Sequence, residues 1–91
     1  MPSIKIPTPL RPYVGGQAQV TVNGETVGAA LQDLVSQYPD LRDQLYNGDQ
    51  LRQFVNVYLG DEDVRFLEGL ETEIDSDDNL RIIPTIAGGV A

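Results

Sequence analysis

The stretch TVGAALQDLVSQY, residues 26–38, decides the fold because it is the longest segment with helical periodicity in this 91-residue chain. Thr26 belongs to the residue types that cap helices, and apolar side chains recur after it at helical spacing. Pro39 ends the helix, since a residue that precedes proline is disfavoured in the α region. The pattern predicts one main helix whose buried stripe covers a sheet. That stripe consists of Val27, Leu31, Leu34, Val35 and Tyr38.

Short segments on both sides of the helix predict the strands of that sheet. Residues 3–6 and 19–22 alternate polar and apolar side chains, and the prolines between them exclude continuous ladder pairing, so residues 7–17 form a loop. Residues 54–59 have the strongest β propensity in the chain. Two further strands are expected, a short or edge strand at residues 64–67 and the last strand at residues 80–84. Residues 39–45 predict a helical turn, and residues 47–49 and 68–78 predict loops.

The element order β-β-α-β-β-β predicts a two-layer α+β domain. The helix is long enough to be the crossover that joins two parallel strands. We expect the first and last strands to lie side by side and parallel in the middle of a mixed four- to five-stranded sheet, with the main helix on one face. This arrangement is the β-grasp fold. The domain is expected to span residues 1–86, followed by a flexible C-terminal tail at residues 87–91.

Composition excludes several classes of function. The chain has 14 Asp and Glu against 6 Lys and Arg, a net charge of −8, so we expect it to bind neither nucleic acid nor an anionic membrane. It has no cysteine and no histidine, which removes thiol chemistry, Ser-His-Asp catalysis and His-based zinc sites. No signal segment or membrane span is visible, which predicts a cytoplasmic protein. We therefore expect no catalytic residues, no metal and no bound cofactor.

Beyond the last strand the chain reads Pro84-Thr85-Ile86-Ala87-Gly88-Gly89-Val90-Ala91. Two consecutive glycines add nothing to a core, because glycine has no side chain to pack and loses the most backbone entropy on ordering. One interpretation is a passive, frayed end. The other is a slim peptide that enters the active site of a partner enzyme. Since no other segment offers reactive groups, any chemistry is expected at this tail.

Three segments together resemble the ubiquitin-like sulfur carriers of the MoaD/ThiS family. They are VNVYLGDEDVRFLEGL at residues 55–70, LRIIP at residues 80–84 and AGG at residues 87–89. The start, IKIPT at residues 4–8 followed by Leu10-Arg11-Pro12 and Gly15-Gly16, is most similar to the CysO branch of that family. The resemblance covers nearly the whole chain. The sequence departs from the family pattern at residues 75–79, where a turn close to Asp-Gly-Asp is usual, and at Val90-Ala91, which follow the second glycine.

The resemblance implies a sulfur carrier in the biosynthesis of cysteine or of a related cofactor or metabolite. A peptidase, often zinc-dependent, would cut between Gly89 and Val90 and remove Val90-Ala91. An E1-like adenylyltransferase would then use ATP to join the Gly89 carboxylate to AMP, and sulfide or a persulfide would convert the adenylate to a thiocarboxylate. A cysteine-synthase-like or other sulfur-acceptor enzyme would receive the sulfur. Two alternatives stay open, a ubiquitin-like modifier conjugated through Gly89 and a small subunit of molybdopterin synthase.

Recognition by these partners needs a narrow tail and a docking surface. Gly88 and Gly89 can thread a channel whose wall a Cβ would meet, with Ala87 just behind them. The candidate partner surface is an apolar group on the sheet face away from the helix, together with the residue just outside the channel. Its members are Phe54, Tyr58, Ile83 and Ile86. The alternative interpretation places Phe54 or Tyr58 in the core.

Overall fold

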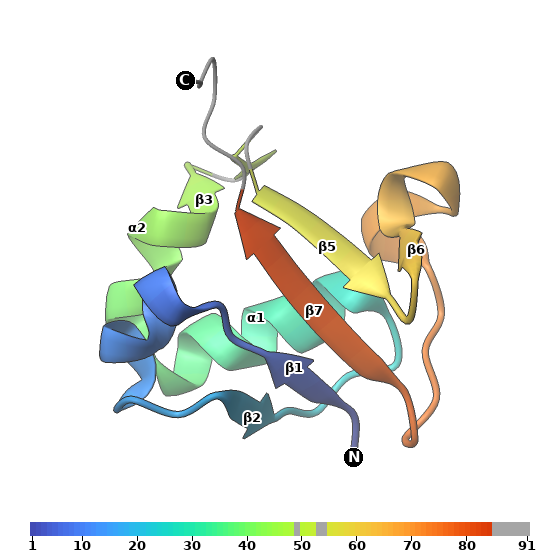
Figure 1. Cartoon of the computed structure of the whole chain (residues 1–91). Helices are drawn as coiled ribbons and strands as arrows, with labels where there is room; N and C mark the ends of the chain where they lie inside the picture. Colours follow the sequence, from blue (N-terminus) through green and yellow to red (C-terminus); the bar gives the residue numbers. More distant parts are fainter. Residues whose placement is uncertain (49, 53–54, 85–91) are drawn as a thin grey trace.

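A five-stranded sheet carries one long helix across a single face in the computed structural model, which describes residues 1–48, 50–52 and 55–84 (Figure 1). The strand order is β2-β1-β7-β5-β6. The first and last main strands, β1 and β7, are parallel neighbours in the middle, and the other pairs are antiparallel. The predicted β-grasp arrangement is confirmed. The strands are β1 (Ser3–Lys5), β2 (Gln19–Thr21), β5 (Val55–Leu59), β6 (Glu62–Asp63) and β7 (Asn79–Pro84).

Helix α1 (Val27–Gln37) forms where its sequence pattern predicts it. The Thr26 hydroxyl accepts a hydrogen bond from the backbone N–H of Ala29 at 3.1 Å, which satisfies one of the free donors of the first turn. The buried stripe packs against the apolar side of the sheet, so burial of these side chains is the main favourable term for the fold. The helix contributes Val27, Ala30, Leu31, Leu34 and Val35, and the sheet contributes Ile4, Val20, Val55, Val57, Leu80 and Ile82.

The connections differ from the sequence prediction in two places and agree with it in a third. The loop at residues 7–17 contains a 3-10 helix, η1 (Thr8–Val14), which packs Leu10 and Val14 into the core. In the loop predicted at residues 47–49, Asn47 belongs to a short strand, β3 (Tyr46–Asn47), which pairs with β4 (Gln50–Leu51), and Asp49 lies outside the described residues. The predicted helical turn at residues 39–45 is present as η2 (Pro39–Leu41) and α2 (Arg42–Leu45).

The prediction of a strand at residues 64–67 is wrong. In this part of the chain only Glu62–Asp63 pair with β5, and residues Val64–Phe66 then form a 3-10 turn, η3. The Asp63 carboxylate accepts a hydrogen bond from the backbone N–H of Arg65 at 2.9 Å and so caps this turn. A second 3-10 turn, η4 (Gly69–Glu71), follows it. A local side-chain cap therefore replaces the ladder pairing that the residue types favoured.

Two glycines allow close contacts with helix α1. A Cβ on Gly24 would lie 2.6 Å from the backbone nitrogen of Ala30, so the loop before the helix can pass there only without a side chain. A Cβ on Gly28 would lie 3.0 Å from the carbonyl oxygen of Leu70, where η4 packs on the first turn of the helix. The pair Asn23-Gly24 thus serves a close approach to the helix and not a tight hairpin.

We expect Leu31→Ala to lower the free energy of unfolding by about 2–5 kcal/mol, because Leu31 is fully buried and its truncation leaves a cavity. Chemical denaturation followed by circular dichroism measures the change. Ser36→Ala is the matched control on the exposed side of the same helix, and it is expected to change stability by less than about 0.5 kcal/mol. Equal midpoints for the two variants would show that the helix stripe is not core.

Gly24→Ala is expected to destabilise the protein by more than about 2 kcal/mol, because its Cβ would collide with backbone atoms that cannot move independently. Gly15→Ala is the control. Gly15 also has a positive φ of 68°, but a Cβ there meets no atom within 4 Å, so only the conformational cost of about 1–2 kcal/mol remains. Thermal unfolding of both variants gives the comparison, and a smaller loss for Gly24→Ala contradicts the close approach.

Candidate functional site

The outer face of the central strands carries the two described members of the predicted partner surface. Tyr58 in β5 is the register partner of Arg81 in β7, and Ile83 lies two residues further along β7. Val57 and Ile82, the neighbours of Tyr58 and Ile83 along each strand, are buried toward the helix, so Tyr58 and Ile83 point to the opposite face. Both are half-buried. The structure therefore places Tyr58 outside the core and on one face with Ile83.

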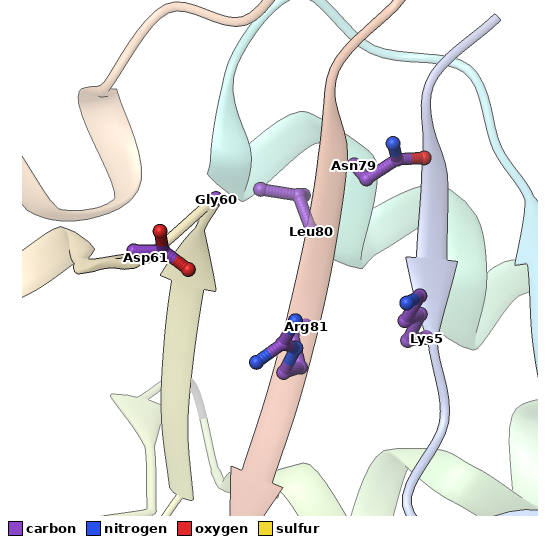
Figure 2. Close-up of a pocket in the computed structure, with 6 residues that line it drawn as sticks. All are labelled: Lys5, Gly60, Asp61, Asn79, Leu80 and Arg81. Carbon is purple, nitrogen blue, oxygen red and sulfur yellow. The ribbon is translucent and has the colours of Figure 1, made fainter.

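Two cations lie on the same face, which the sequence analysis did not identify. Lys5 in β1 is the register partner of Arg81 in β7, and both are exposed. Figure 2 shows the two side chains projecting from neighbouring strands, beside the turn that holds Asp61. With Asn79, Gly60 and Leu80 these residues line a hollow of about 180 Å³. The alternation of the sequence could have placed both cations on this face, because each one stands between two inward-facing apolar residues of its strand.

A second hollow opens where β1 and β7 separate. Their pairing ends at Lys5 and Arg81, because Pro7 has no N–H to donate and the chain turns into η1. The separation leaves an almost wholly apolar hollow of about 250 Å³ next to Ile83, close to the end of β7. An apolar side chain of a partner could occupy it. Its lining residues are Lys5, Ile6, Pro7, Arg81, Ile82 and Ile83.

The tail itself follows the central strand of the sheet. Strand β7 ends at Pro84, which is the register partner of Val55, and the hydrogen bonds of β1 and β5 hold β7 on both sides. Phe54 and the rest of the predicted site lie outside the described residues, as does the predicted boundary between residues 86 and 87. Those further site residues are Ile86, Ala87, Gly88, Gly89 and Val90. Their roles stay predictions.

The described part of the chain contains no group of three or more His, Cys, Asp or Glu that could bind a metal ion. Burial raises the pKa of Tyr46, and the nearby Arg42 charge and the Gln32 side chain oppose this rise. Since the unperturbed pKa of tyrosine is already near 10, the phenol stays protonated at neutral pH.

Across residues 1–48, 50–52 and 55–84, no helix is long and apolar enough to cross a membrane.

The β-grasp fold is that of small ubiquitin-like carrier proteins. The chain belongs to the ThiS family, which it matches over residues 4–89. It is 43% identical to the sulfur carrier protein CysO of Mycobacterium tuberculosis over 90 residues, which is 96% of this chain and 97% of that protein. The predicted family, its CysO branch and the general function of a sulfur carrier are confirmed.

Solved structures agree with this assignment. The crystal structure of the Amycolatopsis orientalis BexX/CysO complex contains a chain with a TM-score of 0.88 and 40% identity, covering 98% of this chain and all of that one. The small archaeal modifier protein 1 of Methanosarcina acetivorans has a TM-score of 0.86 at 29% identity, covering 97% and 95% of the two chains. Sulfur carriers and modifier proteins therefore share this ubiquitin-like fold.

Alanine variants of two consecutive isoleucines in β7, Ile82 and Ile83, test which face of the sheet each side chain occupies. Ile82→Ala is expected to cost about 2–5 kcal/mol of unfolding free energy, because Ile82 is buried under the helix. Ile83→Ala removes the same atoms from a half-buried side chain of the outer face, so we expect a loss of only about 1 kcal/mol. Denaturant titration of the two variants under identical conditions measures both values. Equal losses would place Ile83 in the core and remove it from the candidate surface.

Proposed function

We propose that this chain carries sulfur as a thiocarboxylate on Gly89 and donates it in the biosynthesis of cysteine or of a related metabolite. The observation that carries the proposal is the family match, which runs from residue 4 to residue 89 and ends at the second glycine. The central strand β7 leads directly toward this segment. A rigid domain with a reactive end at its central strand is suited to present that end to several enzymes in turn.

The proposed reaction sequence begins with hydrolysis of the Gly89–Val90 peptide bond by a peptidase, which frees the Gly89 carboxylate. A carboxylate oxygen then attacks the α-phosphorus of ATP, pyrophosphate leaves and an acyl-adenylate forms. Hydrosulfide next attacks the acyl carbon, AMP leaves with the electron pair of the cleaved bond, and the thiocarboxylate remains. The partner enzymes bind ATP and catalyse each step. The carrier supplies the reacting group and its own recognition, with no catalytic residue and no bound cofactor.

The proposed partners are an E1-like adenylyltransferase, a cysteine-synthase-like or other sulfur-acceptor enzyme, and a zinc-dependent peptidase. Docking on a partner enzyme is supported by the Amycolatopsis orientalis complex, in which CysO is crystallised with BexX. On this chain, the outer face with Tyr58 and Ile83 and the apolar hollow beside Ile83 are the features of the described residues that adjoin the tail. Since activation consumes ATP, we expect the carrier to work in the cytoplasm.

A second candidate function is protein modification through Gly89. The similarity to small archaeal modifier proteins favours it, at a TM-score of 0.86 with 29% identity for one of them. Modification would use the same adenylate, but a lysine amine would attack the acyl carbon in place of hydrosulfide.

Gly89→Val is expected to abolish thiocarboxylate formation while leaving the fold intact, because a β-branched side chain at the reacting residue would meet the wall of the partner's channel. The chain is expressed with its peptidase and activating enzyme, supplied with ATP and sulfide, and measured by intact mass spectrometry. The unmodified sequence should lose Val90-Ala91 and exchange one oxygen for one sulfur. Thr85→Val, an isosteric change before the channel, is the control and should react normally.

Each other outcome of this experiment has a definite meaning. A tail that stays unmodified in the original sequence would overturn both the carrier and the modifier function. Conjugates with lysine side chains, without thiocarboxylate, would favour the modifier. Normal thiocarboxylate formation by Gly89→Val would refute the channel argument alone.

A further inference from the structure

An apolar patch at the edge of the sheet is exposed to solvent. Phe66 is 84% exposed, the highest value among the large hydrophobic residues that the structure describes. Leu67 and Leu70, one and four residues further along the chain, are 40% and 37% exposed. We call these three residues the Phe66 patch. Single exposed apolar residues are common, but a group of three with an almost fully exposed phenylalanine is typical of a binding surface.

The local backbone forces Phe66 outward. Turn η3 is short and capped by Asp63, and its first residue, Val64, is buried in the core. The guanidinium of Arg65 donates a hydrogen bond to the carbonyl oxygen of Val55 at 3.1 Å, along the edge of β5. With Val64 directed inward and Arg65 held along the strand, the next side chain in this tight turn is directed to solvent. The exposure of Phe66 is therefore built into the fold.

Two contacts hold the backbone that carries the Phe66 patch. The hydroxyl of the buried Thr72 accepts a hydrogen bond from the backbone N–H of Glu68 at 3.0 Å, which ties together the two ends of the segment that contains Leu70. The backbone of Leu70 packs against Gly28 of helix α1, where a Cβ would lie only 3.0 Å from its carbonyl oxygen. A patch that is ordered before binding loses less conformational entropy when a partner docks on it.

Charge indicates what kind of surface covers the patch. Residues 61–73 contain six Asp and Glu against one Arg, a net charge of −5 out of −8 for the whole chain. Most of these carboxylates are exposed. A second copy of this chain would repel the segment, as would a phosphate-rich membrane or nucleic acid. A protein surface with an apolar pocket and a rim of Lys and Arg is complementary to it.

The patch is linked to the last described residue of β7 through β5. Arg65 precedes Phe66 in η3 and binds the carbonyl of Val55, and Val55 is the register partner of Pro84, the last described residue before the tail. In Figure 1 the segment with η3 and η4 lies beside β6, on the side of β5 away from β7. Because only β5 separates this side from β7, an enzyme that binds the chain beyond Pro84 can extend across β5 to the patch.

We propose that the Phe66 patch is a second docking surface, used by the adenylyltransferase that receives the tail, and that this enzyme presents to it an apolar pocket with a basic rim. This proposal rests on the proposed carrier function. The tail then brings the reacting carboxylate to ATP, and the patch provides affinity and orientation. Loss of the patch raises KM for the carrier and leaves kcat unchanged, because it takes no part in the chemical steps.

The test uses chains that end at Gly89, the activating enzyme, ATP and sulfide, with thiocarboxylate formation measured against carrier concentration. Phe66→Ser is expected to raise KM at least tenfold without changing kcat. Because Phe66 is so exposed, this variant should keep the thermal stability of the original chain. Tyr13→Ser, which changes an exposed aromatic residue of η1, is the matched control and should keep KM within twofold.

A second pair of variants tests the charge argument. Glu68→Gln with Glu71→Gln removes two charges from the rim and should weaken the dependence of KM on ionic strength. Asp40→Asn with Asp77→Asn removes two exposed charges elsewhere and should leave that dependence unchanged. Equal salt dependence in both double variants would contradict a basic rim on the enzyme.

The outcomes separate the two proposals. If the original chain forms thiocarboxylate and Phe66→Ser has the same KM, the docking surface is overturned and the carrier function stands. If the original chain is not adenylated, the proposed function fails and the docking surface fails with it. If sedimentation shows a dimer of this chain that Phe66→Ser abolishes, the patch serves self-association and the proposal is overturned.

Discussion

The parallel pairing of β1 with β7 is the constraint on which the rest of the structure depends. Ile4 and Leu80 are register partners in this pair, and both are fully buried. Parallel neighbours cannot be joined by a tight turn, so the chain between them must cross the sheet, and α1 makes the first part of that crossing. Because the last strand lies in the middle, the tail leaves from the best-supported strand and not from an edge.

The alternation of side chains along the strands gives the sheet two different faces. The inner surface is apolar and covered by α1, and it supplies the burial that makes a domain of 91 residues stable. The outer surface carries Tyr58, Ile83, Lys5 and Arg81, which the alternation of the strands turns away from the core. The same period of two that buries the core side chains therefore also turns these four side chains away from it.

A carrier of this kind separates recognition from reaction. The described residues hold no metal cluster, and burial raises the pKa of the Tyr46 phenol from a value already above neutral pH. The acidic segment at residues 61–73 and the outer face of the sheet offer contrasting charges on one small domain. Such a distribution favours one orientation of the domain against a charged surface, since like charges in the wrong orientation repel.

The sequence by itself determined the helix and the alternating faces of the main strands, because periodicity and capping are properties of contiguous residues. Leu31 and Val57 are buried and Tyr58 points outward as the pattern predicts. Only the tertiary structure decided that Lys5 and Arg81 are neighbours, that Gly28 lies under Leu70, and that Asp63 starts a turn which exposes Phe66. The first two features depend on contacts between residues far apart in the chain, and the third depends on a single cap that competes with ladder pairing. Neither a distant contact nor a single cap produces a periodic pattern in the sequence.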